Sequence, residues 1–282
     1  MKNRRILSLL LVVLSIFLLV SCSKSESTTT DKSSTTDGVS TLKVAASATP
    51  HAEILEQCKE LLLAENIQLE VVIFDDYILP NTATEDGEVD ANYFQHTPYL
   101  EDFNSQNGTH IMSVGKIHYE PFGLYAGNSK QLDDLKTGGK KVAVPNDGTN
   151  EGRALKLLEE KGYLKLNPEA GFQATRLDIV ENPYNIEIVE LDAAQIPRSL
   201  PDVDFGIING NYAIQVGLNA SKDALLLEDG KEAIDTFANV LAVREGLEKD
   251  LRVQALLKVL QSEEIKKYVD EHFEGAVKLL SE

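Results

Sequence analysis

The sequence predicts an α/β protein with two lobes of similar plan and a ligand cleft between them. The chain has 282 residues, of which 43% are apolar and 26% charged, a composition typical of a folded protein. From residue 42 onward, short apolar strands alternate with amphipathic helices, which favours mainly parallel sheets flanked by helices. The order of strand, polar turn and helix occurs at residue 42 and again at residue 141, and this repetition indicates two lobes.

The first residues predict an export signal. Three basic residues precede an apolar run, Ile6 to Val20, which is too short for a membrane-spanning helix and typical of a secretory signal. The four residues that end at Cys22 resemble the lipobox of bacterial lipoproteins, in which the signal is removed before the cysteine and the thiol is acylated. We therefore expect a signal peptide over 1–21 and a lipid such as palmitate on Cys22. The alternative is an uncleaved N-terminal anchor.

Residues 22–41 predict a tether. From Ser23 to Thr41, 12 of 19 residues are Ser or Thr, so this segment has almost nothing to bury. A flexible tether keeps the folded part near the membrane without entering it. With or without cleavage of the signal, we expect the folded part on the extracytoplasmic face of the cell membrane.

Charge and cysteine content exclude several classes of protein. The formal charge is −18, and no basic block beyond the first residues could neutralise a phosphate backbone, so nucleic acid is not an expected partner. Two cysteines cannot form a disulfide scaffold or a four-thiolate metal site. If Cys22 is acylated, Cys58 has no partner. The helical spacing of the apolar residues around Cys58 predicts that it is buried.

The elements of the folded part follow from periodicity and capping signals. Strands are predicted at 42–46, 69–74, 141–144, 186–191 and 204–208. Helices are predicted at 51–64, 151–161, 253–260 and 265–272, the last of them capped by Ser262. Residues 119–134 are a plausible crossover between the lobes. We expect a first lobe over 42–122 with 237–282, and a second lobe over 123–236.

The turn after the strand at 141–144 is a candidate anion site. If Asn150 caps the following helix, Arg153 falls in the first turn, where a cation opposes the helix dipole. A bound carboxylate removes that conflict, because free backbone N–H groups and a bidentate guanidinium both favour an anion. The alternative is an exposed Arg153 paired with a neighbouring Glu.

Aromatic residues and histidines mark a second candidate region. Tyr93, Phe94, His96 and Tyr99 lie too close together in sequence for all of them to enter one core, so we expect some to face the cleft. His96 is followed by two further histidines, which keeps a metal site open, although the spacings match no short metal motif. That alternative set is His96, His110 and His118.

Two asparagines complete the candidates, and several catalytic motifs are missing from the sequence. Asn209 ends an apolar strand, and Asn239 lies inside an apolar run, so each must find hydrogen-bond partners in the protein or in a ligand. The sequence has no Gly-x-Ser-x-Gly elbow, Walker loop, dinucleotide fingerprint or His-Glu-x-x-His motif. We expect a binding cleft and no enzyme.

These stretches resemble the methionine-binding lipoproteins of bacterial ABC importers, the NlpA family. The resemblance covers essentially everything from Leu42 to the C-terminus. The motifs that carry it are Asp76-Tyr77-x-x-Pro80-Asn81, Asp90-Ala91-Asn92-x-Phe94-Gln95-His96-x-Pro98-Tyr99-Leu100, Val142-Ala143-Val144-Pro145-Asn146-Asp147 with Thr149-Asn150-x-Gly152-Arg153, Glu181-Asn182-Pro183, Pro197-Arg198-Ser199-Leu200 and Asn209-x-x-Tyr212-Ala213. Gly148 stands where some relatives have Pro.

The resemblance implies a fold like that of the periplasmic binding proteins and a role in methionine uptake. Such a protein closes on methionine, L or D, and delivers it to a membrane permease driven by an ATPase. By matching position, Arg153 would hold the ligand carboxylate with Asn150 nearby, and Asn209 and Asn239 would hold the amino and carboxylate groups. The side-chain pocket would be walled by Tyr77, Tyr93, Phe94 and His96, with Tyr119 as a further candidate. No cofactor is implied, and we expect a monomer.

Other functions remain open at this point. The cargo could be another amino acid or a Met-containing dipeptide, because one methylene changes affinity by only about 1 to 3 kcal/mol. It could also be a Zn or Mn ion on the histidines. A surface hydrolase would need His96 with Asp90 or Glu120 and lacks a nucleophile. An adhesin role is neither supported nor excluded. For the methionine site, we expect Arg153→Ala to abolish binding and leave the melting temperature of the unliganded protein nearly unchanged.

Overall fold

The computed structural model describes residues 38–280, and the strands within them form two mixed sheets. The predicted signal peptide, the lipid on Cys22 and most of the tether lie outside the described residues. In spatial order, the first sheet contains β13 (Lys278–Leu279), β4 (Ile111–Tyr119), β12 (Asn239–Arg244), β3 (Ala91–His96), β1 (Ser40–Ala46) and β2 (Ile67–Ile73). The second contains β11 (Leu226–Leu227), β5 (Gly123–Ala126), β10 (Phe205–Ile208), β6 (Lys141–Pro145) and β9 (Glu187–Leu191). A separate pair is β7 (Lys165–Leu166) with β8 (Ile179–Glu181).

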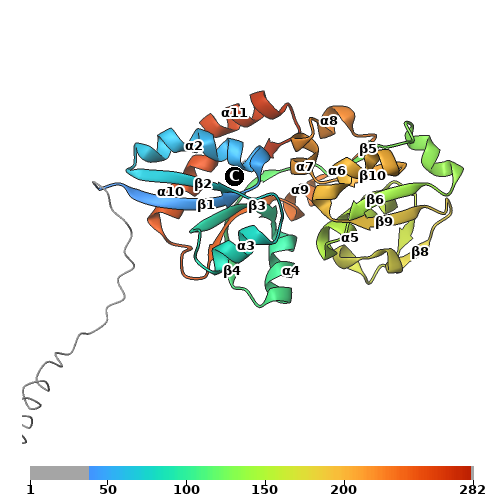
Figure 1. The fold of residues 1–282 in the computed structure, drawn as a ribbon, viewed down its shortest axis with the longest axis horizontal. Coiled ribbons are helices and arrows are strands. Elements are labelled where there is room, and N and C mark those ends of the chain that lie inside the picture. The colour runs from blue at the N-terminus through green and yellow to red at the C-terminus, as the bar shows by residue number, and fades with distance from the viewer. Residues whose placement is uncertain (1–37, 281–282) are drawn as a thin grey trace, which may run out of the picture. The chain divides into compact units, whose positions relative to one another are not determined.

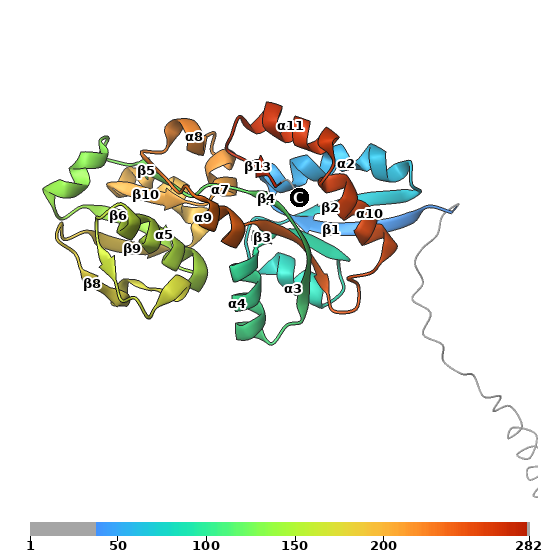
Figure 2. The same cartoon turned by 180° about the vertical axis from the view of Figure 1, so that it is seen from behind.

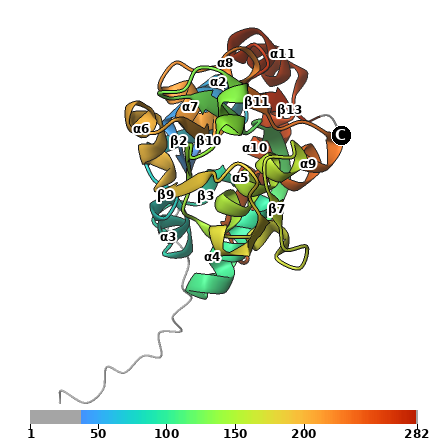
Figure 3. The ribbon, with the colours of Figure 1, turned by 90° about the vertical axis from the view of Figure 1, so that its right-hand side faces the viewer.

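Helices cover both sheets (Figures 1 and 2). They are α2 (Glu53–Leu63), α3 (Leu79–Glu85), α4 (Thr97–Asn107), α5 (Gly148–Glu160), α6 (Ile196–Ser199), α7 (Gly210–Gln215), α8 (Ala220–Asp223), α9 (Lys231–Thr236), α10 (Leu251–Leu260) and α11 (Glu263–Phe273). In the side view of Figure 3, α11 lies at the opposite edge from α3 and α4, so helices flank the first sheet on two sides. The predicted α/β fold with two sheets is therefore confirmed.

The strand directions differ from the prediction in one respect. At the centre of the first sheet, β1 pairs in parallel with β2 and β3, but β12 runs antiparallel to both β3 and β4. In the second sheet, β6 pairs in parallel with β9 and β10, and β5 is antiparallel to β10. The first sheet is mixed because the chain leaves it and the returning β12 enters in the opposite direction, and the second is mixed because β5 runs antiparallel to β10 and β11.

The chain passes between the sheets twice. It leaves the first sheet after β4 through residues 120–122, and it returns from β11 through residues 228–238 to β12. We call these segments the first and second crossovers. They place two buried acidic residues between the sheets, Glu120 in the first crossover and Glu228 in the second.

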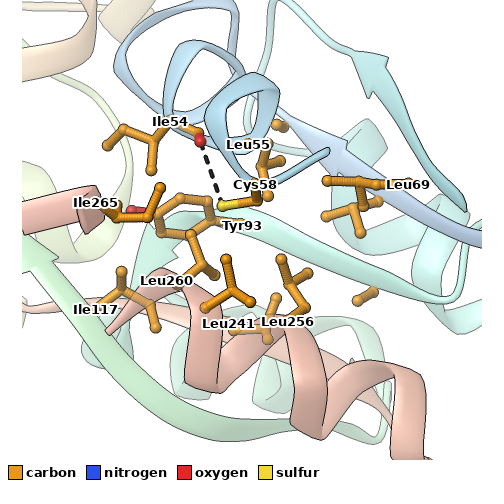
Figure 4. Packing of buried hydrophobic residues seen from close by; sticks show 14 of the residues in the cluster. Ile54, Leu55, Cys58, Leu69, Tyr93, Ile117, Leu241, Leu256, Leu260 and Ile265 are labelled. Atoms are coloured by element: carbon orange, nitrogen blue, oxygen red, sulfur yellow. Dashed lines mark hydrogen bonds between the residues drawn. The ribbon is translucent and has the colours of Figure 1, made fainter. Parts of the chain in front are cut away.

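The core of the first sheet contains the predicted buried cysteine. Cys58 on α2 is fully buried among apolar side chains of β1, β12 and α10, and its Sγ donates to the carbonyl oxygen of Ile54 at 3.4 Å (Figure 4). Burial raises the pKa of the Cys58 thiol to about 12, so it stays protonated. The prediction of a buried, structural Cys58 is confirmed.

Most predicted element boundaries lie close to the observed ones, with two informative differences. β1 begins at Ser40, so the last residues assigned to the tether form a strand beside β2. The helix after β6 is capped by Asp147 and not by Asn150: the Asp147 side chain accepts the Asn150 N–H at 2.9 Å, and α5 begins at Gly148. Ser262 caps α11 as predicted.

A carboxyl pair formed by Glu151 on α5 and Glu190 on β9 gives the second sheet a pH-dependent stability. Glu151 is buried and accepts the Arg176 N–H at 2.8 Å, while Arg176 also pairs with Glu190. Burial, together with the adjacent Glu190 carboxylate, raises the pKa of Glu151 from 4.5 to about 7. Because the pKa is higher in the folded state, this group contributes stability below about pH 4.5, and the contribution is lost as the pH rises through 7.

We expect Glu151→Gln to remove this pH dependence. Gln cannot ionise and keeps an oxygen for the Arg176 N–H, so the melting temperature of the variant relative to wild type should rise between pH 5 and pH 8. Thermal unfolding followed by circular dichroism at the two pH values measures this difference. Glu187→Gln, at an exposed position on β9, is the matched control and should show no such trend. Parallel curves for wild type and Glu151→Gln would contradict the assignment.

Candidate binding site

Seven of the nine predicted binding residues line one cavity between the two sheets. The cavity is narrow, because the centre of a water-sized sphere can occupy only about 20 Å³ of it. The seven are Tyr77, Phe94, His96, Asn150, Arg153, Asn209 and Asn239, and the wall is completed by Gln95, Tyr99, Glu120, Gly210 and Asn211. The remaining two candidates, Tyr93 and Tyr119, are buried outside the cavity wall. The site is therefore built from residues of both sheets and of the first crossover.

Arg153 lies at the back of the cavity and is buried. Because Asp147 is the N-cap, Arg153 sits in the second turn of α5, so the predicted conflict with the helix dipole is absent. The alternative of an exposed arginine is wrong as well, since only 4% of Arg153 is exposed. Its guanidinium lies between two aromatic rings, 4.6 Å from the centroid of Phe122 and 4.2 Å from that of Phe237.

Glu228 of the second crossover holds one edge of this guanidinium. Arg153 Nε donates to Glu228 Oε1 at 2.9 Å, and Nη2 donates to Glu228 Oε2 at 2.5 Å. Nη2 also donates to the backbone oxygen of Glu120 at 3.0 Å. Within residues 38–280, Nη1 makes no hydrogen bond, so two N–H groups are left for an anion in the cavity.

Tyr119 supports Glu228 and does not line the cavity. Its hydroxyl donates to Glu228 Oε2 at 2.6 Å, and the Phe122 N–H donates to the same oxygen at 3.4 Å. Burial alone would raise the pKa of Glu228, but Arg153 and these two donors outweigh it and hold that pKa below its usual value. Glu228 is therefore an ionised partner of Arg153, and the Tyr119 ring also lies 5.9 Å from the guanidinium carbon of Arg153.

Asn150 joins the two sides of the cavity. Its side-chain NH₂ donates to Asp147, so its oxygen faces the cavity. That oxygen accepts from His96 Nε2 at 3.0 Å and from Asn209 Nδ2 at 3.0 Å. Asn209 Oδ1 is buried and has no hydrogen-bond partner within the described part of the chain. It is an acceptor left over for a ligand N–H group.

His96 is a neutral donor. Its Nδ1 accepts the backbone N–H of Tyr99 at 3.2 Å, which places the ring proton on Nε2, the atom that faces Asn150. Burial, reinforced by the nearby charge of Arg153, lowers the pKa of His96 to about 3. His96 therefore carries no charge near neutral pH.

Glu120 brings a second carboxyl group to the cavity, and sequence reasoning did not place it there; burial raises the pKa of this group. Glu120 Oε1 accepts from His118 Nε2 at 2.7 Å and lies 3.4 Å from His51 Nε2. His51 Nε2 also donates to Asn239 Oδ1 at 3.0 Å. Burial lowers the pKa of His51 to about 4 and that of His118 to about 3, so both rings are neutral near pH 7. A signal was available, since Glu120 ends a strand at the crossover.

The predicted metal set is not assembled. His110 is 67% exposed and bonds to Glu85, while His96 bonds to Asn150. In residues 38–280, the potential ligand atoms of His51, His118 and Glu120 do lie within 4.8 Å of one another. Hydrogen bonds among these groups account for their positions, because each Nε2 is used as a donor.

The opposite end of the cavity is aromatic. The Tyr77 ring lies 5.9 Å from Phe94, 5.7 Å from Tyr99 and 5.0 Å from Tyr212, measured between centroids. Tyr77 Oη donates to Asn211 Oδ1 at 2.6 Å, and Tyr212 Oη donates to the backbone oxygen of Asp75 at 3.1 Å. These contacts join the two sheets and wall a space suited to an apolar side chain.

Tyr93 lies behind the cavity and not in its wall. It is fully buried in the core of the first sheet, where its ring makes edge contacts with His51 and His118, and its hydroxyl bonds to His118 Nδ1. The β-strand period explains this position, because Tyr93 and Phe94 are neighbours on β3 and point to opposite faces.

The cavity can bind a small zwitterion, and it offers no nucleophile with a base. Of the residues suggested for a hydrolase, Asp90 accepts the Lys43 N–H and pairs with Arg252, and it does not line the cavity. His96 bonds to an amide oxygen and not to a carboxylate. What the cavity offers is a partly free guanidinium, a buried carboxylate, unpaired amide oxygen and aromatic walls.

Comparison with known proteins decides the family. Residues 42–279 match the sequence model of the NlpA lipoprotein family. The chain belongs to the NlpA lipoprotein family. The methionine-binding lipoprotein MetQ of Bacillus subtilis is 40% identical to this family member over 251 residues, which cover 87% of this chain and 90% of that protein.

Solved structures agree with this assignment to the NlpA family. A Ruminococcus gnavus protein described as a lipoprotein has 55% identity and a TM-score of 0.84, covering 86% of this chain and 99% of that one. A nutrient-binding protein from Burkholderia cenocepacia, solved with bound methionine, has 41% identity and a TM-score of 0.80 and covers 84% of this chain and 99% of its own. Within residues 38–280, no helix is long and apolar enough to cross a membrane.

The buried ion pair changes what is expected of Arg153 variants in this NlpA-family protein. The sequence predicted that removal of Arg153 would leave the unliganded protein equally stable. Removal of Arg153 would instead leave Glu228 without its charged partner, and the Glu228 carboxylate is only 7% exposed. A buried charge without its partner typically costs about 3 to 5 kcal/mol.

We therefore expect Arg153→Met and Glu228→Gln each to lower the free energy of unfolding of the unliganded protein. The loss for Arg153→Met should approach about 3 kcal/mol, and the double variant should lose less than the two single losses added together. Urea denaturation measures all three. Lys165→Met, which breaks the exposed pair with Glu181, is the control and should cost less than about 1 kcal/mol. Equal losses for Arg153→Met and Lys165→Met would contradict the role of the pair.

Proposed function

We propose that this NlpA-family protein binds methionine outside the cytoplasm and delivers it to an ABC transporter permease and its ATPase. The observation that carries the proposal is the cavity itself, where an unpaired guanidinium edge and a buried carboxylate lie at one end and aromatic rings at the other. A relative named for methionine binding and a neighbour solved with methionine support the same ligand.

The ligand carboxylate would bind Arg153. Nη1 of Arg153 makes no hydrogen bond within residues 38–280. Because Glu228 fixes the other edge of the guanidinium, the free N–H groups are held in one orientation. A charge-assisted hydrogen bond to a carboxylate contributes more than a neutral one. Asn150 and His96 hold each other in place beside this position and complete the polar end.

The ligand amino group would bind acceptors on the other side of the polar end. Asn209 Oδ1 is unpaired within the described residues, and the Glu120 carboxylate lines the cavity. Asn239 Oδ1 accepts from His51, so the Asn239 NH₂ group is left to donate to the ligand carboxylate and not to hold the amine. The side chain would then lie against Tyr77, Phe94 and Tyr99, where thioether contacts with aromatic rings contribute about 0.3 to 1.5 kcal/mol each.

Attachment and closure are further parts of the proposal. A lipid on Cys22 and the Ser/Thr-rich tether would hold the protein at the extracytoplasmic face of the membrane. The protein would act as a monomer of two lobes, one over 42–122 with 237–282 and the other over 123–236. The two crossovers supply the hinge, which allows the lobes to separate for entry and release.

Calorimetry with methionine tests the ligand. We expect one site per monomer, leucine at least tenfold weaker, and a loss of about tenfold or more in affinity for Asn209→Ala, because an amine acceptor is removed. Asn209 Oδ1 has no partner among residues 38–280, and the variant loses only the bond from Nδ2 to Asn150, so we expect the free energy of unfolding of the unliganded protein to fall by no more than about 1 to 2 kcal/mol. Asn128→Ala, at an exposed position, is the control. Absence of methionine binding by the wild type would refute the proposal, and unchanged affinity of Asn209→Ala would refute this site.

Small-angle scattering tests closure. Contacts between the sheets, such as Tyr212 Oη to the Asp75 oxygen, should form more often with ligand bound, so methionine should reduce the radius of gyration. The same data give the molecular mass and hence the oligomeric state. An identical radius of gyration with and without saturating methionine would be incompatible with a hinge at the crossovers.

A further inference from the structure

A buried polar chain leads from the core of the first sheet to the cavity. It runs from Tyr93 on β3 through His118 on β4 to Glu120 at the start of the first crossover. Tyr93 and His118 are fully buried, and Glu120 is 6% exposed. Figure 4 shows the Tyr93 ring among apolar side chains, so the hydroxyl has few polar neighbours to choose from.

The hydrogen bonds that link Tyr93, His118 and Glu120 have a defined direction. Burial raises the pKa of Glu120, and a cation in the cavity would favour its ionised form. Because an ionised carboxylate only accepts, this form places the His118 proton on Nε2. His118 Nδ1 is then an acceptor, and the Tyr93 hydroxyl donates to it. Because His118 is neutral, it has one ring proton, and Tyr93 keeps that proton on the side of Glu120.

The other side of Glu120 is also fixed. The Asn211 N–H bonds to the carboxylate, and His51 Nε2 lies 3.4 Å from Oε1. Gly210 allows this approach, because a Cβ at that position would lie 2.6 Å from Glu120 Oε2. A carboxylate offers about four acceptor positions, and two donors, His118 Nε2 and the Asn211 N–H, use this one, because His51 Nε2 gives its proton to Asn239 Oδ1. The remaining capacity is on the side that lines the cavity.

The charges around Glu120 indicate which ligand group would bind on its cavity side. His51 and His118 are neutral near pH 7, and Arg153 is paired with Glu228 and reaches Glu120 only at its backbone oxygen. Among the described residues, the Glu120 side chain therefore has neutral donors around it and no cation bonded to it. A buried carboxylate in this state is stabilised strongly by a cation that enters the cavity.

We propose that Tyr93 and His118 are positioning residues that hold Glu120 to accept the protonated α-amino group of the ligand, so that the protein selects ligands with a free α-amino group. This inference rests on the proposed function. It gives Tyr93 a role that differs from the pocket wall expected from sequence, and it gives His118 a role other than the metal ligand considered from sequence. In this proposal Arg153 binds the ligand carboxylate. Glu120, positioned by His118 and Tyr93, binds the ligand amino group.

The test compares methionine with 4-(methylsulfanyl)butanoate, which keeps the carboxylate and the thioether and lacks only the amino group. Wild type should bind this analogue at least about 100-fold more weakly, because Glu120 is left without a cation. His118→Leu and Tyr93→Phe should weaken methionine binding about tenfold or more and change analogue binding much less. The dissociation constant of the analogue divided by that of methionine should therefore fall. His118→Gln, which restores a donor near the Nε2 position, should return the ratio to within a few-fold of wild type.

Two matched controls separate positioning from general disruption. His110→Gln changes an exposed histidine, and Tyr125→Phe removes a buried hydroxyl that has no partner within residues 38–280. Both should keep the wild-type ratio. Tyr93→Phe removes a single oxygen atom, so it remains informative if His118→Leu does not fold.

The outcomes distinguish this inference from the proposed function. If wild type binds methionine and the ratio is unchanged in Tyr93→Phe and His118→Leu, the positioning role is overturned and the methionine site stands. If wild type binds methionine and the analogue with equal affinity, Glu120 does not bind the amino group, and the inference also fails. If wild type binds no methionine, the proposed function itself falls.

Discussion

The site depends on the buried pair of Arg153 and Glu228. Glu228 belongs to the second crossover, and Arg153 on α5 also bonds to the backbone oxygen of Glu120 in the first crossover. One guanidinium therefore ties together the two segments that connect the sheets. A ligand carboxylate at its free edge would contact the same group that bonds to both crossovers. The arrangement is stable because the pair is bidentate and lies between two aromatic rings.

Neutral histidines make the rest of the polar end selective. Burial keeps His51, His96 and His118 uncharged, so each acts as an oriented N–H donor and adds no charge. A charged histidine beside Glu120 would satisfy that carboxylate and remove its preference for a cationic ligand group. With the rings neutral, the free guanidinium edge and the carboxylate are left for the two charges of a zwitterion, one at each side of the polar end.

The sequence predicts the fold class and most of the cavity residues. It does not predict roles that depend on contacts between residues far apart in the chain or on the exact backbone geometry. Strand and helix periodicity locates β1, β6 and α5 to within a few residues, and the family motifs bring seven of nine residues to the cavity wall. The role of Tyr93 is missed because neighbours on a strand face opposite ways. Glu228 is missed because its partner is 75 residues away and no local pattern signals a buried ion pair. The cap is assigned to Asn150 since both Asp and Asn are good caps, and only the backbone shows which one is used.

Asn150 explains why both sheets are needed for a complete site. Its oxygen accepts from His96 on β3 of the first sheet and from Asn209 after β10 of the second, and Asp147 fixes its orientation through the NH₂ group. If the sheets separate, His96 loses this acceptor, and its N–H must turn to water. The hydrogen bond is therefore available only when the sheets are together, as is the full set of groups around the ligand. A ligand that contacts both the guanidinium of Arg153 and the aromatic wall of Phe94 and Tyr99 therefore contacts residues of both sheets, because neither sheet carries both groups.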